Sequence, residues 1–385
     1  MPGKKHIKEK MTKTFAAVLT FLFVTGVPAY SQPSQDLNIF GYKFLDYRDQ
    51  VLPEKLLSTR SAVFVSALPK ANGSRGDWKA LSEKAHDYFK RMHIDAIAYF
   101  HVQDVFSGRE SLQAFIGWLA KRKVENLIFL AETNLNGTKG YRLIVAPFNG
   151  QPGMMPDGQK AWKSEETEFE RLFVLLHRAV GKANMKRENY LIVDQPEFFS
   201  DAPLISGKRF EDYQQDLKLD KLAVPWFSKI KIPSQYPPDS LNDRLAREAR
   251  EYNASVDQYN ERLRQIMSAY PYEYGFVDLD EKKPEQLRNE GYQFILYCIN
   301  TSGRTAKGLL DYKVQETETD FVSLTAGLQG ASIKTLPVDY PIFKFYIKHI
   351  FTSNVFLGSK WDADVDWENA LLNHLSGLRS ELGVK

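Results

Sequence analysis

The chain has 385 residues, of which 43% are hydrophobic and 26% are charged, with 23 Gly and 18 Pro. This is the composition of an ordinary globular protein, and it excludes collagen-like, disordered and multi-span membrane proteins. Residues 1–31 hold five Lys and one Glu, and the rest of the chain is almost neutral, with 46 basic and 47 acidic residues. A near-neutral chain without a basic cluster in its sequence gives no electrostatic reason to expect a nucleic-acid partner.

The first 31 residues predict a secretory signal peptide. A Lys-rich stretch (residues 4–13) precedes an apolar run (residues 15–27), and the small residues Ala29 and Ser31 stand where a signal peptidase expects them. The apolar run is shorter than the roughly 20 residues that a membrane-spanning helix needs. We therefore expect cleavage after Ser31 rather than an uncleaved anchor, and no membrane span in the mature chain.

The chain has a single cysteine, Cys298, so it cannot form an internal disulfide. A mature chain of this length has a core large enough not to need one, and this cysteine usage suits a bacterial periplasm better than an animal extracellular space. We therefore expect a secreted protein of the bacterial periplasm. The sequence does not decide whether Met1 or Met11 is the true start.

The first half of the chain, residues 32–220, predicts one α/β domain. Short apolar runs alternate with amphipathic segments of helical period, which is the pattern of parallel strands joined by helices. Strands are expected at residues 61–67, 94–100, 124–130, 141–148 and 189–193. Helices are expected at residues 78–92, 107–119 and around 169–180, with a short one near 210–217.

The second half, residues 221–385, repeats this order. Strands are expected at residues 227–232, 274–279, 292–299, 309–314 and 354–357, and shorter helices at 342–351 and 367–378. Three matched positions lie 168, 172 and 165 residues apart, and the second of these pairs His177 with His349. The sequence therefore predicts two tandem related α/β domains, each with a mixed, mostly parallel sheet flanked by helices. The order of elements resembles that of small cell-envelope domains with an anticodon-binding-like topology, which implies a fold and no function.

A long helix, predicted from about residue 240 to 270 in the second half, breaks this symmetry. Apolar residues recur along it in a heptad pattern: Leu245, Ala249, Tyr252, Val256, Tyr259, Leu263, Ile266 and Tyr270. Such a helix would be about 45 Å long. Either it lies across its own sheet and the neighbouring domain, or part of its seam packs against a partner helix or a second copy of the chain. The second interpretation predicts a homo-oligomer.

No catalytic motif identifies an enzyme. The phosphate-binding pattern GxxxxGK[ST], a GxGxxG after a strand and the GxSxG nucleophile motif are absent, and no histidines have zinc-site spacing. Asp194 and Glu197 follow the predicted strand at 189–193, as the acidic strand end of a nucleotide hydrolase would, but without a phosphate loop. They are the best available candidates for catalytic acids. We expect no cofactor.

The densest acidic cluster contains Asp362, Asp364 and Asp366. Alternating carboxylates can ligate Ca²⁺, but an EF-hand loop needs Gly and Glu at the positions that Trp367 and Asn373 occupy. The competing interpretation is that Asp366 caps the last helix and that no metal binds. These three carboxylates are the candidates for a metal site.

Six aromatic residues stand at the ends of predicted elements or in loops: Tyr141, Trp162, Trp226, Tyr236, Trp361 and Trp367. Large rigid rings of this kind line ligand or partner surfaces, or they seal the junction between domains. We expect a non-enzymatic binding or scaffold protein of the bacterial cell envelope, which recognises a protein or a small ligand through the groove between its domains or through the long helix. The alternative is a secreted hydrolase or nucleotide hydrolase that uses Asp194 and Glu197.

Overall fold

The computed structural model of the chain describes residues 44–384, except 136, 152, 200–201, 234–240 and 328–329. The described residues belong to one compact unit. The predicted signal peptide and Tyr236 lie outside the described residues. In the described part of the chain, no helix combines the length and the apolar character that crossing a bilayer requires.

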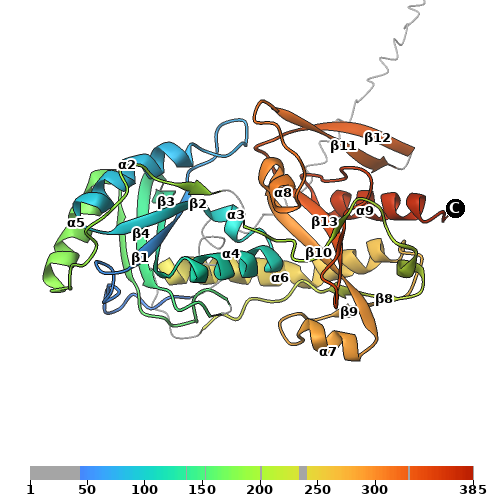
Figure 1. The fold of residues 1–385 in the computed structure, drawn as a ribbon, viewed down its shortest axis with the longest axis horizontal. Coiled ribbons are helices and arrows are strands. Elements are labelled where there is room, and N and C mark those ends of the chain that lie inside the picture. Colours follow the sequence, from blue (N-terminus) through green and yellow to red (C-terminus); the bar gives the residue numbers. More distant parts are fainter. Residues whose placement is uncertain are drawn as a thin grey trace, which may run out of the picture. The chain divides into compact units, whose positions relative to one another are not determined.

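The fold is mixed α/β, with two six-stranded sheets, a two-stranded hairpin and eight helices among the described residues (Figure 1). The first sheet has the strand order β5-β4-β3-β1-β2-β6. Strand β1 is parallel to β2 and β3, and β4 is antiparallel to β3 and β5. The strands are β1 (Arg60–Ser66), β2 (Asp95–His101), β3 (Val124–Leu135), β4 (Thr138–Pro147), β5 (Trp162–Glu166) and β6 (Phe198–Phe199).

Helices cover both faces of the first sheet. They are α2 (Trp78–Arg91), α3 (Val102–Val105), α4 (Arg109–Lys121) and α5 (Phe169–Lys182). Helix α2 begins where the carboxylate of Asp77 accepts a hydrogen bond from the backbone N–H of Ala80, at 3.1 Å. Because α2 and α5 pack on one face and α3 and α4 on the other, β1 is buried at every position after Arg60.

The second sheet has the strand order β7-β14-β13-β10-β8-β9. Strand β8 is parallel to β9 and β10, and β13 is antiparallel to β10 and β14. The strands are β7 (Arg209–Phe210), β8 (Lys221–Pro225), β9 (Tyr274–Val277), β10 (Tyr292–Ser302), β13 (Pro341–His349) and β14 (Val355–Phe356). The other elements of this half are α6 (Leu241–Met267), α7 (Pro284–Asn289), α8 (Gly303–Leu309), α9 (Trp367–Glu381) and the hairpin β11 (Asp320–Gly327) and β12 (Gly330–Pro337).

Two strand predictions in the second half are wrong. No strand forms at 227–232, because the strand of this region, β8, already ends at Pro225. The strand expected at 309–314 is instead the end of α8 and the loop after it.

The predicted helix at 342–351 is wrong, because this segment is β13. Its residues Phe343 and Phe345 face one core cluster, and Ile342 and Tyr346 face another. With apolar residues on both faces, the strand period of two is not visible in the sequence. His349 therefore ends a strand and does not correspond to His177 on α5.

The predicted strand at 189–193 is also wrong. The segment belongs to no strand, and the side chains of Tyr190 and Leu191 are 81% and 94% exposed. Its composition has the β-propensity of a buried strand, but the edge strand next to β2 is formed farther along the chain, by β6.

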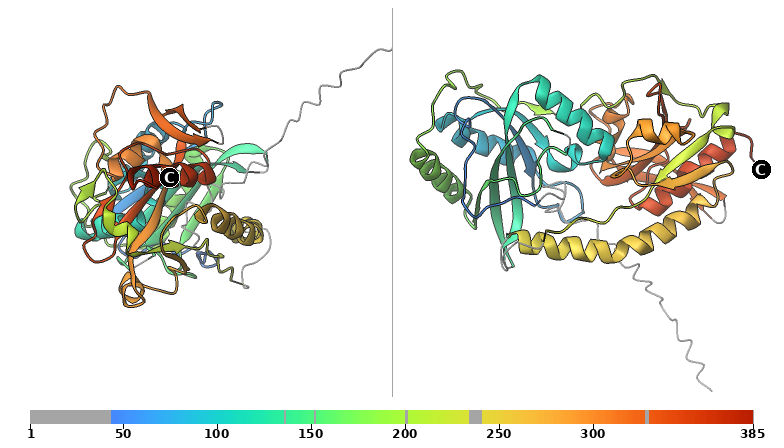
Figure 2. Two further views of the ribbon diagram at one scale, coloured as in Figure 1. Left: turned by 90° about the vertical axis from the view of Figure 1, so that its right-hand side faces the viewer. Right: turned by 90° about the horizontal axis from the view of Figure 1, so that it is seen from below.

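Helix α6 has 27 residues and runs along both sheets (Figure 2, yellow). Leu245 and Ala249 pack in a core cluster to which both sheets contribute, whereas Tyr259, Leu263 and Ile266 pack against the second sheet alone. These described residues of the apolar seam thus pack within the chain itself.

Among the described residues, the core consists of three apolar clusters. One lies between the first sheet and α2 and α5, and a second lies between the second sheet and α6 and α9. The third combines side chains from both sheets, for example Phe64 and Phe129 from the first and Ile295 and Tyr346 from the second. The two sheets therefore share part of one core.

Candidate functional site

The order of the parallel strands in the second sheet changes direction at β8. After β8 the chain runs through α6 and adds β9 on one side of β8. It then runs through α7 and adds β10 on the opposite side of β8. Strand β10 pairs with β8 only as far as Ile295, so the two strands diverge toward their carboxyl ends. In open α/β sheets, such a switch in strand order leaves a crevice in which ligands bind.

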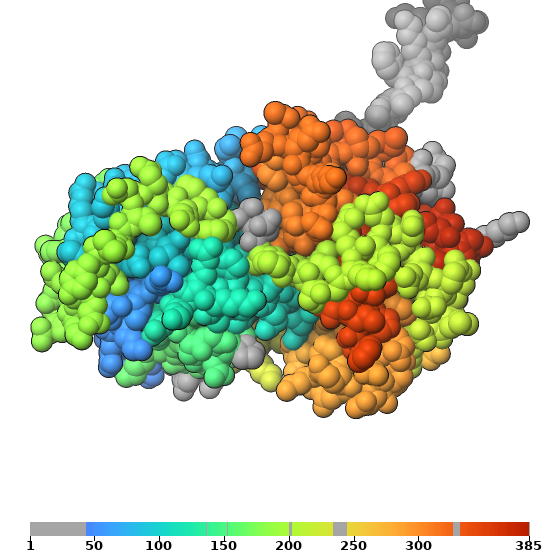
Figure 3. Space-filling view, in the orientation of Figure 1, coloured from blue at the N-terminus to red at the C-terminus, as the bar shows by residue number. Residues whose placement is uncertain are grey.

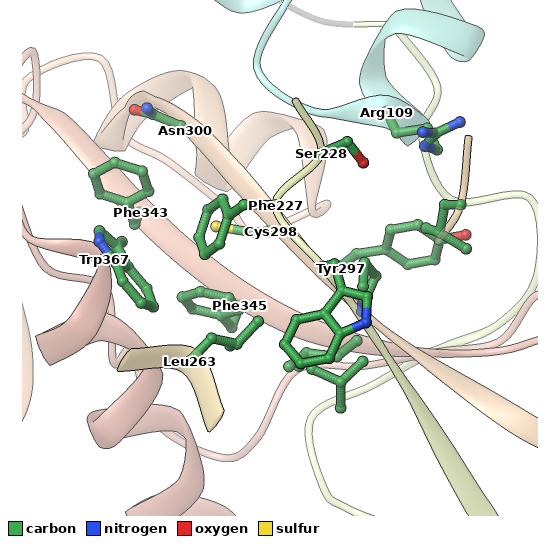
Figure 4. Close-up of a pocket in the computed structure, with 15 residues that line it drawn as sticks. Arg109, Phe227, Ser228, Leu263, Tyr297, Cys298, Asn300, Phe343, Phe345 and Trp367 are labelled. Carbon is green, nitrogen blue, oxygen red and sulfur yellow. The ribbon is translucent and has the colours of Figure 1, made fainter. Parts of the chain in front are cut away.

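A pocket of about 290 Å³ occupies this crevice (Figure 4). Its lining comes from α4 of the first half and from β8, α6, β10, β13 and α9 of the second. The residues are Arg109, Val224, Pro225, Trp226, Phe227, Ser228, Leu263, Leu279, Leu296, Tyr297, Cys298, Asn300, Phe343, Phe345 and Trp367. Of the six aromatic residues singled out from the sequence, the structure brings two together here, Trp226 and Trp367.

The segment after β8 forms one wall of the pocket because two amide side chains of α6 bind its backbone. The Asn260 side chain accepts from the N–H of Phe227 at 2.9 Å and donates to its carbonyl at 3.0 Å. Asn253 does the same for Ile230, at 2.7 and 2.9 Å. These bonds replace the strand ladder that ends at Pro225, and they hold Trp226 and Phe227 at the pocket.

Ring contacts fix the aromatic wall. Phe227 meets Trp367 edge to face with a centroid distance of 5.0 Å, and Trp226 stacks on Phe276 at 3.9 Å. The Arg264 guanidinium lies over the Trp226 ring, 5.3 Å from its centroid. Each ring is thus held by a neighbour, and the pocket is formed before a ligand arrives.

The polar groups of the pocket are few. The Asn300 side-chain oxygen, Oδ1, is buried and has no hydrogen-bond partner among the described residues. Burial raises the pKa of the Cys298 thiol to about 12, so this sulfur is uncharged and a poor nucleophile at neutral pH. The Arg109 guanidinium pairs with Asp280. Figure 4 shows the Asn300 amide directed away from the centre of the pocket, so a ligand with a hydrogen-bond donor would reach this unpaired oxygen after the side chain turns inward.

The first half of the chain holds β10 in place beside the pocket. The backbone N–H of Asn300 donates to the carbonyl of Ser107 at 2.7 Å. At the next residue, the hydroxyl of Thr301 donates to Asp104 at 2.6 Å and accepts from Arg75 at 2.6 Å, while Arg75 and Asp104 form a 2.5 Å ion pair. This largely buried network fixes the end of β10 against the first half.

The other predicted aromatic residues lie elsewhere. Trp162 is buried in the core of the first sheet, and Tyr141 packs edge to face on Phe169. Trp361 packs against Phe321 and Tyr312 at the base of the hairpin.

The acidic cluster is tied to cations of the protein. The Asp362 carboxylate is buried, 2.6 Å from Lys344 Nζ and 3.2 Å from His374 Nδ1. Burial by itself raises the pKa of Asp362, but the Lys344 charge and the His374 hydrogen bond outweigh it and lower this pKa below its usual value. Asp364 pairs with Lys334 at 2.9 Å.

The third carboxylate of this cluster, Asp366, caps α9 by accepting from the N–H of Asn369 at 2.9 Å, as the capping interpretation predicts. Among the described residues, no three His, Cys, Asp or Glu side chains are placed to hold a metal ion.

Asp194 and Glu197 do not converge on the pocket. Asp194 is exposed and pairs with Lys90, whose hydrogen bond lowers the pKa of this carboxyl. Glu197 lies 3.9 Å from Arg122. Neither side chain belongs to the lining of the pocket described above.

Sequence reasoning missed Asn300 and Arg109 as site residues. Both come from elements distant in sequence, and neither belongs to a local motif. No protein-family model matches the chain, and a search of curated proteins finds none with significant sequence similarity to it.

Proposed function

We propose that the chain is an exported, non-enzymatic binding protein of the bacterial cell envelope. It holds a small aromatic molecule, or one aromatic side chain of a protein partner, in the pocket beside β8. The observation that carries this proposal is a preformed pocket with aromatic walls and one unpaired amide oxygen, Asn300 Oδ1. Export rests on the N-terminal pattern and the single cysteine.

The size of the pocket selects the ligand class. Sites for drug-sized ligands have volumes of about 300–1,000 Å³, and this pocket is at the lower limit with about 290 Å³. One or two fused rings fit such a volume. The walls of Trp226, Phe227 and Phe345 favour a flat apolar body, and Asn300 Oδ1 favours an N–H or O–H on that body.

We further propose that the two halves are related repeats, with a boundary between residues 220 and 221. The support is that five strands of each sheet correspond in order and direction, β1 to β5 with β8, β9, β10, β13 and β14. The second repeat then has the heptad-patterned α6 in place of α2, and it has an inserted hairpin, β11–β12, between β10 and β13. The proposal needs no homo-oligomer, because the described seam of α6 is buried within the chain.

The hydrolase alternative receives no comparable support. Catalytic carboxylates must reach a common substrate, whereas Asp194 and Glu197 each face a separate cation at the surface. Replacing both should leave ligand binding intact, and loss of an activity on that replacement would favour the alternative.

Indole and benzofuran test the proposal, because they have the same shape and only indole has an N–H donor. We expect indole to raise the melting temperature and to bind about tenfold or more tightly than benzofuran, since benzofuran leaves Asn300 Oδ1 unpaired. Calorimetric titration measures the two affinities. Asn300→Leu should remove the preference for indole.

Two further variants complete the test. Cys298→Phe places a ring in the pocket and should abolish binding of both compounds, whereas Tyr141→Phe, which alters an aromatic residue outside the pocket, should bind as the parent does. Equal affinity of the parent for both compounds, or unchanged binding in Cys298→Phe, would overturn the proposal.

A further inference from the structure

Three helices of the first sheet end on the same side of the molecule. Strands β1, β2 and β5 run in one direction, and α2, α4 and α5 return from them in the opposite direction. The carboxyl ends of these helices therefore gather where β1 and β2 begin. Basic residues occupy the last turns and the residues that follow, and we call this set the basic end: Lys90, Arg91, Lys121, Arg122, Lys123, Lys182, Lys186 and Arg187.

The basic end carries net positive charge. Lys90, Arg122 and Lys186 each face a carboxylate, those of Asp194, Glu197 and Glu188. Within the residues that the structure describes, the other five cations have no ion pair. Their charge is available to an anionic surface.

Two large apolar side chains project at the same place. Tyr190 and Leu191 are 81% and 94% exposed. The preceding residue, Asn189, fixes their position, because its backbone N–H donates to the carbonyl of Leu57 at 3.1 Å and its side chain donates to that of His93 at 3.1 Å. These two carbonyls belong to residues that lie three positions before β1 and two positions before β2. Figure 3 shows the segment after α5 lying open at the surface.

We propose that the basic end, with Tyr190 and Leu191, docks on an anionic lipid surface. Exposed aromatic and aliphatic side chains beside Lys and Arg are the composition of interfacial membrane binding: the apolar groups enter the boundary of headgroups and acyl chains, and the cations meet the headgroup phosphates. The positive charge of the basic end and the negative charge of the lipid headgroups favour this partner. The pocket beside β8 takes no part in it.

The test uses the mature chain and vesicles. We expect the protein to sediment with vesicles of phosphatidylethanolamine and phosphatidylglycerol, and not with vesicles of phosphatidylcholine alone. Each Lys or Arg near the surface contributes about fivefold in affinity, so Lys182→Gln and Arg187→Gln should each weaken binding by about that factor, and added salt should weaken it further.

The apolar part is tested separately. The double variant Tyr190→Ser, Leu191→Ser should bind anionic vesicles about tenfold more weakly, and its melting temperature should stay close to that of the parent because both side chains are exposed. Leu219→Ser is the matched control: Leu219 is 83% exposed just before β8, and its replacement should leave vesicle binding unchanged.

Two results would overturn the proposal. One is unchanged vesicle binding by the double serine variant. The other is binding of the parent to polyglutamate but not to anionic vesicles, which would assign the basic end to an acidic protein partner.

Discussion

Lys344 Nζ lies 2.6 Å from Asp362 Oδ1, and the two side chains are 0% and 6% exposed. Lys344 belongs to β13, and Asp362 belongs to the segment between β14 and α9. The ion pair therefore ties that segment to the second sheet. Lys344 Nζ also donates to the carbonyl of Leu357 at 3.0 Å, at the start of the same segment.

Removing one member of this pair leaves a buried charge without a partner. We expect Asp362→Asn to lower the free energy of unfolding by about 3–5 kcal/mol, measured by chemical denaturation. The double variant Lys344→Met, Asp362→Leu should recover most of this loss. The control is Glu170→Gln, which removes an exposed pair with Lys84 and should leave the free energy of unfolding almost unchanged, because water screens the two charges. A cost for Asp362→Asn no larger than that of the control would contradict the role of the pair.

Acid should destabilise the protein in two stages. Burial lowers the pKa of His374, although the neighbouring Asp362 acts to raise it. Burial also holds the pKa of His101 well below its usual range, and the positive charge of Arg75 adds a smaller effect in the same direction. As pH falls below about 6.5, these histidines take up protons in the unfolded chain first, so the free energy of unfolding falls. Asp362 adds a second loss below about pH 4, because its pKa is lowered in the folded state.

Denaturation curves at a series of pH values measure both stages. The double variant His101→Asn, His374→Asn should flatten the dependence near pH 6, and a slope as steep as that of the parent would show that other groups cause it.

Two glycines of α4, Gly108 at its N-cap and Gly117 in its interior, should respond oppositely to alanine. A Cβ on Gly108 would lie 2.6 Å from the carbonyl oxygen of Cys298, a backbone atom that cannot move without displacing β10. Gly108→Ala should therefore cost about 1–3 kcal/mol. A Cβ on Gly117, inside α4, would meet nothing within 4 Å, and Gly117→Ala should stabilise by about 0.5–1 kcal/mol. Equal effects in thermal unfolding would mean that the halves do not approach closely at Gly108.

The seam of α6 should affect stability rather than assembly. Leu263 is 3% exposed, so Leu263→Ala should lower the free energy of unfolding by about 2–5 kcal/mol, whereas Gln258→Ala on the exposed side of α6 should change it by less than about 0.5 kcal/mol. Light scattering should give the same molar mass for the parent and both variants. A molar mass that falls in Leu263→Ala alone would instead support the interpretation that the seam of α6 forms a homo-oligomer.

Much of the strand and helix order follows from local patterns. The buried runs at 61–67 and 124–130 correspond to β1 and β3, and the last helix begins at Trp367 with Asp366 as its cap, as expected, because continuous burial and side-chain caps are local signals. The segments 342–351 and 189–193 mislead for opposite reasons. The first is apolar on both faces of a sheet, and the second is apolar although it lies at the surface.

The candidate site was accessible from the sequence only in part. Trp226 and Trp367 stand out as large rings at the ends of elements, and both line the pocket. Asn300 could not be found this way, because an unpaired oxygen is a property of the surroundings that β8, β10 and β13 create together. The basic end was hidden likewise: its cations come from three helices, and only the parallel strand order brings them to one side.

The core cluster to which both sheets contribute has a consequence for how this chain can be altered. A side chain such as Phe129 or Ile295 has neighbours that belong to that common cluster. A fragment containing either sheet alone would leave a broad apolar face in water, where aggregation competes with folding. The two sheets are therefore expected to melt as one cooperative block, and neither can be excised or exchanged without redesign of the other.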